Sequence, residues 1–228
     1  MRSQTAATYE TLKNQLLDGH FEPGAKLKID RVSSMCDASP GAVREALSRL
    51  TSEGLVVSVP QRGFMVAQMS TEDLLDLTEV RIDIEIKCLR RSIEYGDLAW
   101  EARIQSARHQ LRHTPVLVDN AKGVNPEWSR AHIEFHDTLI SACNSEWWLK
   151  LRNQMFMQAE RYRRMLYTYA KMTRDIDAEH EAIVDATLAR DADLACKLLA
   201  AHAQETANDL VASVAPLDAQ HKVETAAS

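Results

Sequence analysis

The strongest local signals in this chain lie in Ser39–Val66, SPGAVREALSRLTSEGLVVSVPQRGFMV. Ser39 is a typical helix-capping residue, and Pro40 suits the first helical position, where its missing N–H would have no partner anyway. The run that follows favours a helix to about Leu50. Two valine-rich segments then flank the turn Pro60–Gly63, which predicts a short β-hairpin.

Two helical segments precede this stretch. Apolar residues recur at helical spacing in Thr5–Leu17, and a second short helix is predicted over Ile29–Cys36. Three helices followed by a hairpin form a winged helix-turn-helix, so we expect residues 1–69 to bind DNA through the third helix. Its apolar face leaves Arg44 pointing outward, where it can reach a major groove. The alternative for Arg44 is an ordinary solvated helix face.

The charge of the chain is divided unevenly along its 228 residues. The formal net charge is −6. Residues 1–70 hold eight Lys and Arg against seven Asp and Glu, whereas residues 71–228 hold 19 against 26. A nearly neutral domain can still bind DNA if its cations share one face, because phosphate attraction depends on local charge. Charge alone would not predict a nucleic-acid partner.

Cysteine spacing and hydropathy predict the cellular compartment of the protein. The four cysteines lie far apart in mostly apolar helical patterns, which predicts neither a disulfide framework nor a CxxC site. The chain shows no charged-then-apolar leader and no apolar run of membrane-spanning length. We therefore expect a cytoplasmic protein with no membrane partner.

After Met69 the pattern becomes continuously helical. Ser70 caps an acidic helix start, which predicts a domain boundary at about residue 70. At least six helices follow, over residues 71–94, 98–111, 126–142, 146–168, 173–190 and 192–214. The expected fold is mainly α: a winged helix-turn-helix with a small β-hairpin wing over 1–69, then an all-α bundle over 70–214. Residues 215–228 lack a pattern and are predicted to be disordered.

Four histidines suggest a ligand site in the helical half. His132 and His136 are four residues apart, so on a helix they share one face and can bind the same cation. His180 and His202 lie in the last two predicted helices. A lone helical histidine is more often a packed or exposed residue than a ligand, which is the alternative for each of them.

The run Leu27–Val66, with VREALSRLTSEGLV followed by PQRGFMV, resembles the winged-helix domain of GntR-family bacterial transcriptional regulators of the FadR-like subfamily. The resemblance implies a symmetric homodimer that contacts double-stranded operator DNA through the recognition helix and the wing. Many members have a basic residue where Pro40 stands and a hydroxyl residue where Gly41 stands, so the operator sequence cannot be transferred. The predicted DNA contacts are Lys28, Arg31, Ser39, Gly41, Arg44, Arg49, Arg62 and Gly63.

The segments Ile133–Ser145 and Glu179–His202 resemble the FCD ligand-binding domain of the same subfamily. In many FCD domains an Asp and three histidines hold a divalent metal. Here His132 stands at the Asp position, so the resemblance implies a four-histidine set with His136, His180 and His202. An all-nitrogen set favours Zn or Ni over Mn as the cofactor. Loss of metal binding through the Asp replacement is the alternative.

An acid effector follows from the same chemistry. A metal with an open position takes a carboxylate, and a nearby guanidinium can clamp it. Arg81 resembles the arginine of the R-x-x-[LI]-E pattern on the first FCD helix; its alternative is a surface i,i+4 pair with Glu85. Arg161 and Tyr162 belong to a basic, aromatic patch that is predicted to contribute to the effector site, although such runs are usually solvated faces.

The resulting prediction is a repressor of a catabolic operon, released from its operator by a small carboxylic acid. The boundary run MSTEDLLD and the histidine before the F-H pair resemble a branch of such repressors that respond to dicarboxylates or related acids. The alternatives are a metal-dependent enzyme and a pure metal sensor. No Glu-x-x-His, HExxH, GxSxG, P-loop or GxGxxG motif occurs, so we expect no enzymatic activity.

Overall fold

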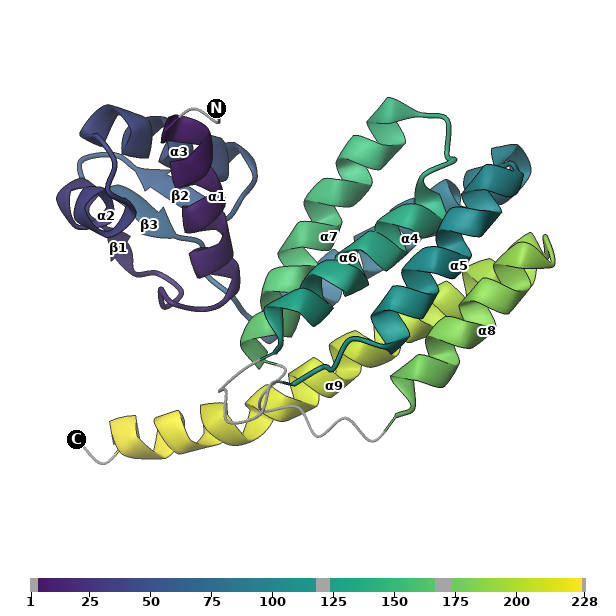
Figure 1. The fold of residues 1–228 in the computed structure, drawn as a ribbon. Helices are drawn as coiled ribbons and strands as arrows, with labels where there is room; N and C mark the ends of the chain where they lie inside the picture. Colours follow the sequence, from purple (N-terminus) through teal and green to yellow (C-terminus); the bar gives the residue numbers. More distant parts are fainter. Residues whose placement is uncertain (1–3, 118–123, 167–173, 227–228) are drawn as a thin grey trace. The chain divides into compact units, whose positions relative to one another are not determined.

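The computed structural model describes residues 4–117, 124–166 and 174–226, and the chain divides into two compact units (Figure 1). The first unit contains the chain up to Ser70 together with the short segment Glu160–Met165. The second contains Thr71–Ala159 and the chain from Leu166 onward. The fold is mainly helical, as the sequence predicts.

The first unit is a winged helix-turn-helix. Its three antiparallel strands are ordered β1-β3-β2, with Val57 opposite Met65 in the predicted hairpin and Leu27 opposite Phe64 in the added pair. The two-residue strand β1 was not predicted, because it is too short to show an alternating pattern. The elements are α1 (Gln4–Leu17), β1 (Lys26–Leu27), α2 (Ile29–Cys36), α3 (Pro40–Ser52), β2 (Val56–Val59) and β3 (Gly63–Val66).

Helix α3 is held in place by its apolar stripe. Val43, Ala46, Leu47 and Leu50 recur at helical spacing, and all four are fully buried. The helix packs mainly against α1 and also against α2. Full burial of each larger aliphatic side chain contributes about 1.5–3 kcal/mol, so this stripe fixes which face of α3 points to solvent.

The second unit is a helical bundle. Figure 1 shows its helices running side by side; α4 packs against α9 and α6, and α5 packs against α6 and α8. Trp100 and Phe135 are fully buried at its centre. The elements are α4 (Thr71–Tyr95), α5 (Leu98–Arg112), α6 (Pro126–Ile140), α7 (Glu146–Leu166), α8 (Ile176–Leu188) and α9 (Ala192–Ala226).

Side-chain caps set where the histidine-bearing helices begin. The Asn125 side chain accepts a hydrogen bond from the Glu127 N–H at the start of α6, and Pro126 occupies the first turn. Asp175 accepts from the Ala178 N–H at the start of α8. Such caps pair N–H groups that have no partner within the helix, so they fix the register in which the histidines are presented.

Helix α9 is longer than the sequence pattern predicts. The apolar periodicity ends at about Val214, and residues 215–228 were expected to lack regular structure, yet α9 continues to Ala226. The segment contains Pro216, which is unfavourable in a helix interior, so its composition gives no signal that predicts this continuation. The predicted end of the helix over 146–168 and the predicted start of the helix over 173–190 lie outside the described residues.

None of the helices in the described ranges is both long and apolar enough to cross a membrane.

Candidate DNA-binding face and candidate metal centre

Helix α3 presents a polar face from a fixed starting point. The Ser39 hydroxyl accepts a hydrogen bond from the Ala42 N–H at 3.3 Å, and Pro40 occupies the first turn, both as predicted. With the apolar stripe inward, Arg44 and Ser48 are exposed. Among the described residues no ion pair involves Arg44, so its guanidinium can reach an external acceptor without breaking an internal contact.

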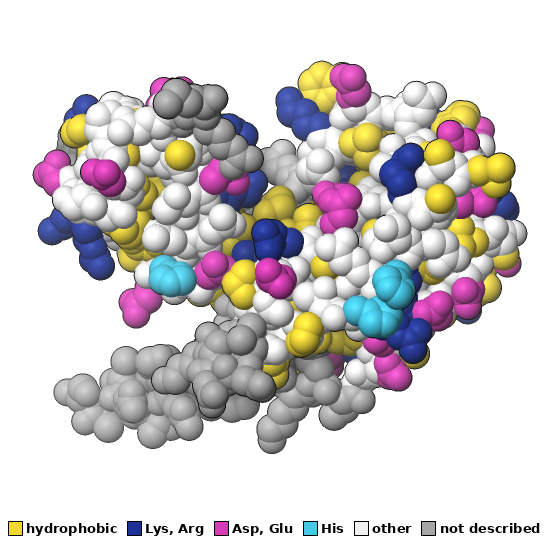
Figure 2. Space-filling model, viewed as in Figure 1, with side chains coloured by type: hydrophobic (Ala, Val, Ile, Leu, Met, Phe, Trp, Pro, Cys, Tyr) yellow, Lys and Arg dark blue, Asp and Glu magenta, His cyan; other side chains and the backbone are white. Residues whose placement is uncertain are grey.

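All eight residues predicted to contact DNA are exposed in the first unit. Figure 2 shows Lys and Arg side chains gathered at the lower left edge of this unit, where α2 and β1 lie in Figure 1. The eight come from four places: the approach to α2, α2 itself, α3 with its cap, and the turn between β2 and β3. They are Lys28, Arg31, Ser39, Gly41, Arg44, Arg49, Arg62 and Gly63.

Arg49 differs from the other predicted DNA contacts. Its guanidinium lies over the Tyr9 ring, 3.7 Å from the centroid, and its Nε is 3.4 Å from Glu53. The Tyr9 hydroxyl in turn donates to Glu53 at 2.7 Å. These contacts tie the end of α3 to α1. Arg49 thus has a structural contact as well, while its side chain is still 59% exposed, and its contact with DNA stays a prediction.

The tip of the wing needs a glycine for its backbone. Gly63 has φ +83°, a left-handed conformation that is costly for residues with a Cβ. A Cβ built at Gly63 would meet no atom within 4 Å, so the constraint is conformational and the space beside it is open. Arg62, immediately before it, is exposed. The wing tip therefore projects a cation into open space.

The four predicted histidines converge inside the second unit. His132 and His136 come from α6, His180 from α8 and His202 from α9. All four are buried, and each offers one ring nitrogen such that the four nitrogens lie within 4.8 Å of one another. Zn–N bonds are about 2.0–2.1 Å long, so small side-chain rotations would let these atoms share one ion.

The protonation state of His136 favours binding of a cation. Burial, followed by the repulsion from the other three histidines, holds the pKa of His136 well below its usual value, so this imidazole is neutral at pH 7. Its Nε2 is buried and has no hydrogen-bond partner among the described residues. An unpaired buried nitrogen is costly, and a metal ion would satisfy it. The residues present therefore fit a divalent metal.

Aromatic side chains wall the cluster. Trp128 stacks on His132 with ring centroids 4.8 Å apart, and the Phe156 ring lies 5.5 Å from that of His136. Phe135 packs against His180 at 4.8 Å. These rings place apolar surface around the buried imidazoles, and a low local dielectric strengthens electrostatic interactions. Trp128 and Phe156 were not singled out from the sequence, because aromatic residues on helices are more often simple core residues.

Arg81 belongs to a buried ion network beside this wall. Its Nε lies 3.2 Å from Glu85, and Arg152 also pairs with Glu85 at 3.1 Å and with Asp137. The guanidinium of Arg81 lies 4.8 Å from the centre of the Phe156 ring. The i,i+4 pair considered for Arg81 is thus present, but it is buried and not on the surface.

Arg161 and Tyr162 belong to the segment Glu160–Met165, which is part of the first unit. Arg161 donates to the Ala67 carbonyl oxygen at 2.7 Å, and the Tyr162 hydroxyl accepts from the Ser70 N–H at 3.1 Å. Both side chains thus contact the backbone after the wing, and their predicted effector role stays a prediction.

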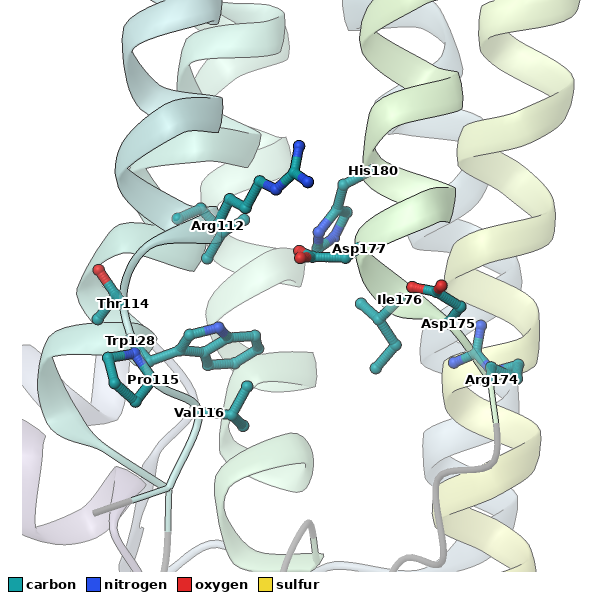
Figure 3. A pocket seen from close by; sticks show the side chains of 11 residues that line it. Arg112, Thr114, Pro115, Val116, Trp128, Arg174, Asp175, Ile176, Asp177 and His180 are labelled. Carbon is teal, nitrogen blue, oxygen red and sulfur yellow. The ribbon is translucent and has the colours of Figure 1, made fainter. Parts of the chain in front are cut away.

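A pocket of about 360 Å³ lies beside the histidine cluster and is lined by one of the four histidines, His180. Figure 3 shows two walls, one from the end of α5 with Trp128 and the other from the start of α8, with His180 pointing towards the space between them. Two arginines and two aspartates line it together with apolar side chains. The lining residues are Leu111, Arg112, Thr114, Pro115, Val116, Trp128, Arg174, Asp175, Ile176, Asp177 and His180.

The chain matches two family descriptions. Residues 4–66 match "Bacterial regulatory proteins, gntR family", and residues 76–205 match the FCD domain. A relative from Paraburkholderia xenovorans (strain LB400), "Uncharacterized HTH-type transcriptional regulator BphR", is 37% identical over 90% of this chain and 84% of its own length. "HTH-type transcriptional repressor GlaR" from Escherichia coli (strain K12) is 33% identical over 85% of this chain and 90% of its own length.

Solved structures share the fold. E. coli McbR/YncC has a TM-score of 0.76 at 21% identity and covers 92% of this chain and 98% of its own. A putative transcriptional regulator GntR from Rhodococcus sp. RHA1 has a TM-score of 0.71 at 23% identity, covering 92% of this chain and 99% of its own.

Proposed function

The chain belongs to the GntR family of bacterial regulatory proteins and carries an FCD domain, and we propose that it is a repressor that a small carboxylic acid releases from operator DNA. It is a DNA-binding transcriptional regulator and not an enzyme. The name of the relative GlaR, a transcriptional repressor, supports the direction of control. We also propose that the operon it represses is catabolic.

We propose that operator binding uses a homodimer. One recognition helix reads one half-site, and two copies related by a two-fold axis read half-sites about one helical turn apart. Arg44 on α3 and Arg62 at the wing tip are the exposed cations that this arrangement would bring to bases and phosphates. Lys28 and Arg31 would add phosphate contacts, which hold the register without reading sequence.

The ligand half of the proposal rests on one observation, the convergence of four histidine nitrogens to within 4.8 Å in a buried, water-poor site. His132, His136, His180 and His202 would hold one divalent cation. The all-imidazole set favours Zn or Ni over Mn. When bound, the ion would supply an open coordination position for a carboxylate oxygen.

The pocket would admit such an acid and limits its size. Its volume of about 360 Å³ is near the lower end of the usual range for small-molecule sites, so the acid is small. His180 lines the pocket, and Trp128 and Val116 offer an apolar wall for the carbon skeleton. Arg112 lines the same space and favours an anion, whereas Arg174 is already paired with Glu179 and Asp209, and Asp175 and Asp177 oppose a large negative charge.

Release follows if the acid binds one conformational state better than another. A ligand shifts an equilibrium only by its difference in affinity for the two states. Helix α4 begins at Thr71, directly after the first unit ends at Ser70. A change in how α4 packs in the bundle would therefore alter the spacing of two recognition helices in a dimer, and half-site spacing tolerates little change.

A thermal-shift screen tests this function. The protein is loaded with Zn²⁺ or Ni²⁺, or treated with a chelator, and a panel of mono-, di- and hydroxycarboxylic acids is added. We expect at least one small acid to raise Tm only in the metal-loaded protein, and the same acid to weaken binding to DNA from the region upstream of the gene. Acids that act equally well after chelation would contradict a metal-bound carboxylate.

A pure metal sensor is the second candidate. Four histidines can complete a tetrahedral shell without any organic ligand, and structural or sensing sites are closed in this way. The same screen separates the two functions. A metal sensor would change its operator affinity when the metal alone is added, and no acid in the panel would change it further.

A further inference from the structure

A chain of hydrogen bonds stands behind one of the four histidines. The Nδ1 of His202 lies 2.7 Å from Oε2 of Glu179. Arg174 donates from one terminal nitrogen to both oxygens of Glu179, at 2.8 and 2.7 Å, and from Nε to Asp209 at 2.8 Å. Glu179 is thus held in place from one side while it contacts a candidate metal ligand on the other.

The proton in this contact can be assigned from chemistry. Both oxygens of Glu179 accept hydrogen bonds from the Arg174 guanidinium, and one of them also contacts Nδ1 of His202. A carboxylate paired with a guanidinium in this way offers only acceptor atoms. The hydrogen must then be on Nδ1 of His202, and the lone pair that a metal could use is on Nε2.

We propose that Glu179 is the positioning residue of the metal centre, holding His202 in the Nδ1–H form so that Nε2 is the atom offered to the ion. This inference rests on the proposed metal-binding function. Histidine ligands commonly donate their second ring N–H to a carboxylate, which fixes the tautomer and the ring orientation and makes the ligand nitrogen more basic. Glu179 meets these requirements, whereas Arg174 and Asp209 act one step further out.

A purely structural role is the competing explanation, because Glu179 on α8 also ties α8 to α9 through His202. The two roles differ in what they predict. A structural link would change the free energy of unfolding and leave the intrinsic metal affinity of folded protein unchanged. A positioning role would change the metal affinity of protein that remains folded.

The test compares the dissociation constants for Zn²⁺ and Ni²⁺ of the full chain, Glu179→Ala, Glu179→Gln and Glu181→Ala, by competition with a chromophoric chelator. We expect Glu179→Ala to weaken binding by about 10–100-fold. Glu179→Gln should recover part of this loss, because an amide oxygen can still accept from Nδ1–H. Glu181 is a carboxylate of the same helix that pairs with Arg108, so Glu181→Ala is the matched control and should bind as the unmodified protein does.

A second measurement needs no variant. Long-range ¹H–¹⁵N spectra of the metal-free protein report which ring nitrogen of each histidine carries hydrogen, and we expect Nδ1–H for His202. An Nε2–H form, or unchanged metal affinity in folded Glu179→Ala, would overturn the role of Glu179 alone. Failure of the unmodified protein to bind either ion would overturn the proposed metal function, and this inference with it.

Discussion

Glu85 is a single buried carboxylate between two guanidinium groups, those of Arg81 and Arg152. Replacing it with glutamine keeps the size but removes the anion beside buried Arg81 and leaves Arg152 with Asp137 as its remaining carboxylate. Breaking a buried ion pair from one side costs about 3–5 kcal/mol. We expect Glu85→Gln to lower the free energy of unfolding by about that amount in urea titrations followed by circular dichroism. Glu94→Gln, on an exposed position of the same helix, is the matched control and should change little.

The pH dependence of this network has a definite sign. Burial raises the pKa of Glu85, but Arg81 and Arg152 outweigh it and hold the pKa below its usual value. A carboxyl group with a lowered folded-state pKa stabilises the fold above its unfolded pKa of about 4.3, and this stabilisation is lost as the pH falls through the folded pKa. The stability difference between the unmodified protein and Glu85→Gln should therefore shrink below about pH 4.3. A constant difference down to pH 2 would contradict it.

Arg44 is the residue on which specific DNA reading depends in this account. Arg44→Ala should weaken operator binding by about 1–3 kcal/mol if the guanidinium reads a base edge. Fluorescence anisotropy with labelled operator DNA at fixed salt measures the change. Arg103→Ala removes the same charge from an exposed position of α5 and should leave the affinity unaltered. Equal affinities for Arg44→Ala and the unmodified protein would remove Arg44 from the interface.

Among the elements, the wing offers a paired test of backbone conformation. Gly63→Ala places a Cβ on a left-handed residue, which should lower the free energy of unfolding by about 1–2 kcal/mol. Gly41→Ala makes the same change in helix α3, where the nearest neighbouring atom is 4.0 Å away, and should stabilise by about 0.5–1 kcal/mol. Urea titration of both variants checks the opposite signs. Destabilisation of equal size at both positions would contradict the conformational explanation.

Elements with strong local signals could be predicted from the sequence. Helix α3 has a capping serine, a proline in its first turn and an apolar stripe, and β2 and β3 flank an evident turn. Strand β1 could not be predicted, because two residues carry no periodicity and its pairing with β3 depends on a partner far along the chain. The extra length of α9 could not be predicted, because Pro216 disfavours a helix and the residues after Val214 show no apolar periodicity.

The candidate site shows the same division. His132 and His136 are four apart on one helix, and the resemblance to FCD domains added His180 and His202. Glu179 could not be found in this way, since it precedes His180 in sequence but contacts His202, 23 residues away. Such contacts depend on how two helices pack. The backbone contacts of Arg161 and Tyr162 could not be predicted for a related reason: composition indicates a basic, aromatic face but not what that face contacts.

On the scale of the whole molecule, one unit presents an exposed cationic helix and wing, and the other encloses a ligand centre. The proposed response requires both. His180→Ala should bind operator DNA as the unmodified protein does but should no longer be released by the acid, because the ion that holds the carboxylate would be lost. His109→Ala changes an exposed histidine on α5 and should leave the response intact. Acid-induced release that persists in His180→Ala would show that the acid does not bind at the four histidines.

The central claim is that the four buried histidines hold one ion, and metal content measures it most directly. The purified protein is incubated with Zn²⁺ or Ni²⁺, freed of excess metal and examined by elemental analysis together with His180→Ala and His109→Ala. We expect one ion per chain in the unmodified protein and in His109→Ala, and a large loss in folded His180→Ala. Equal metal content in all three proteins, or none in any of them, would contradict it.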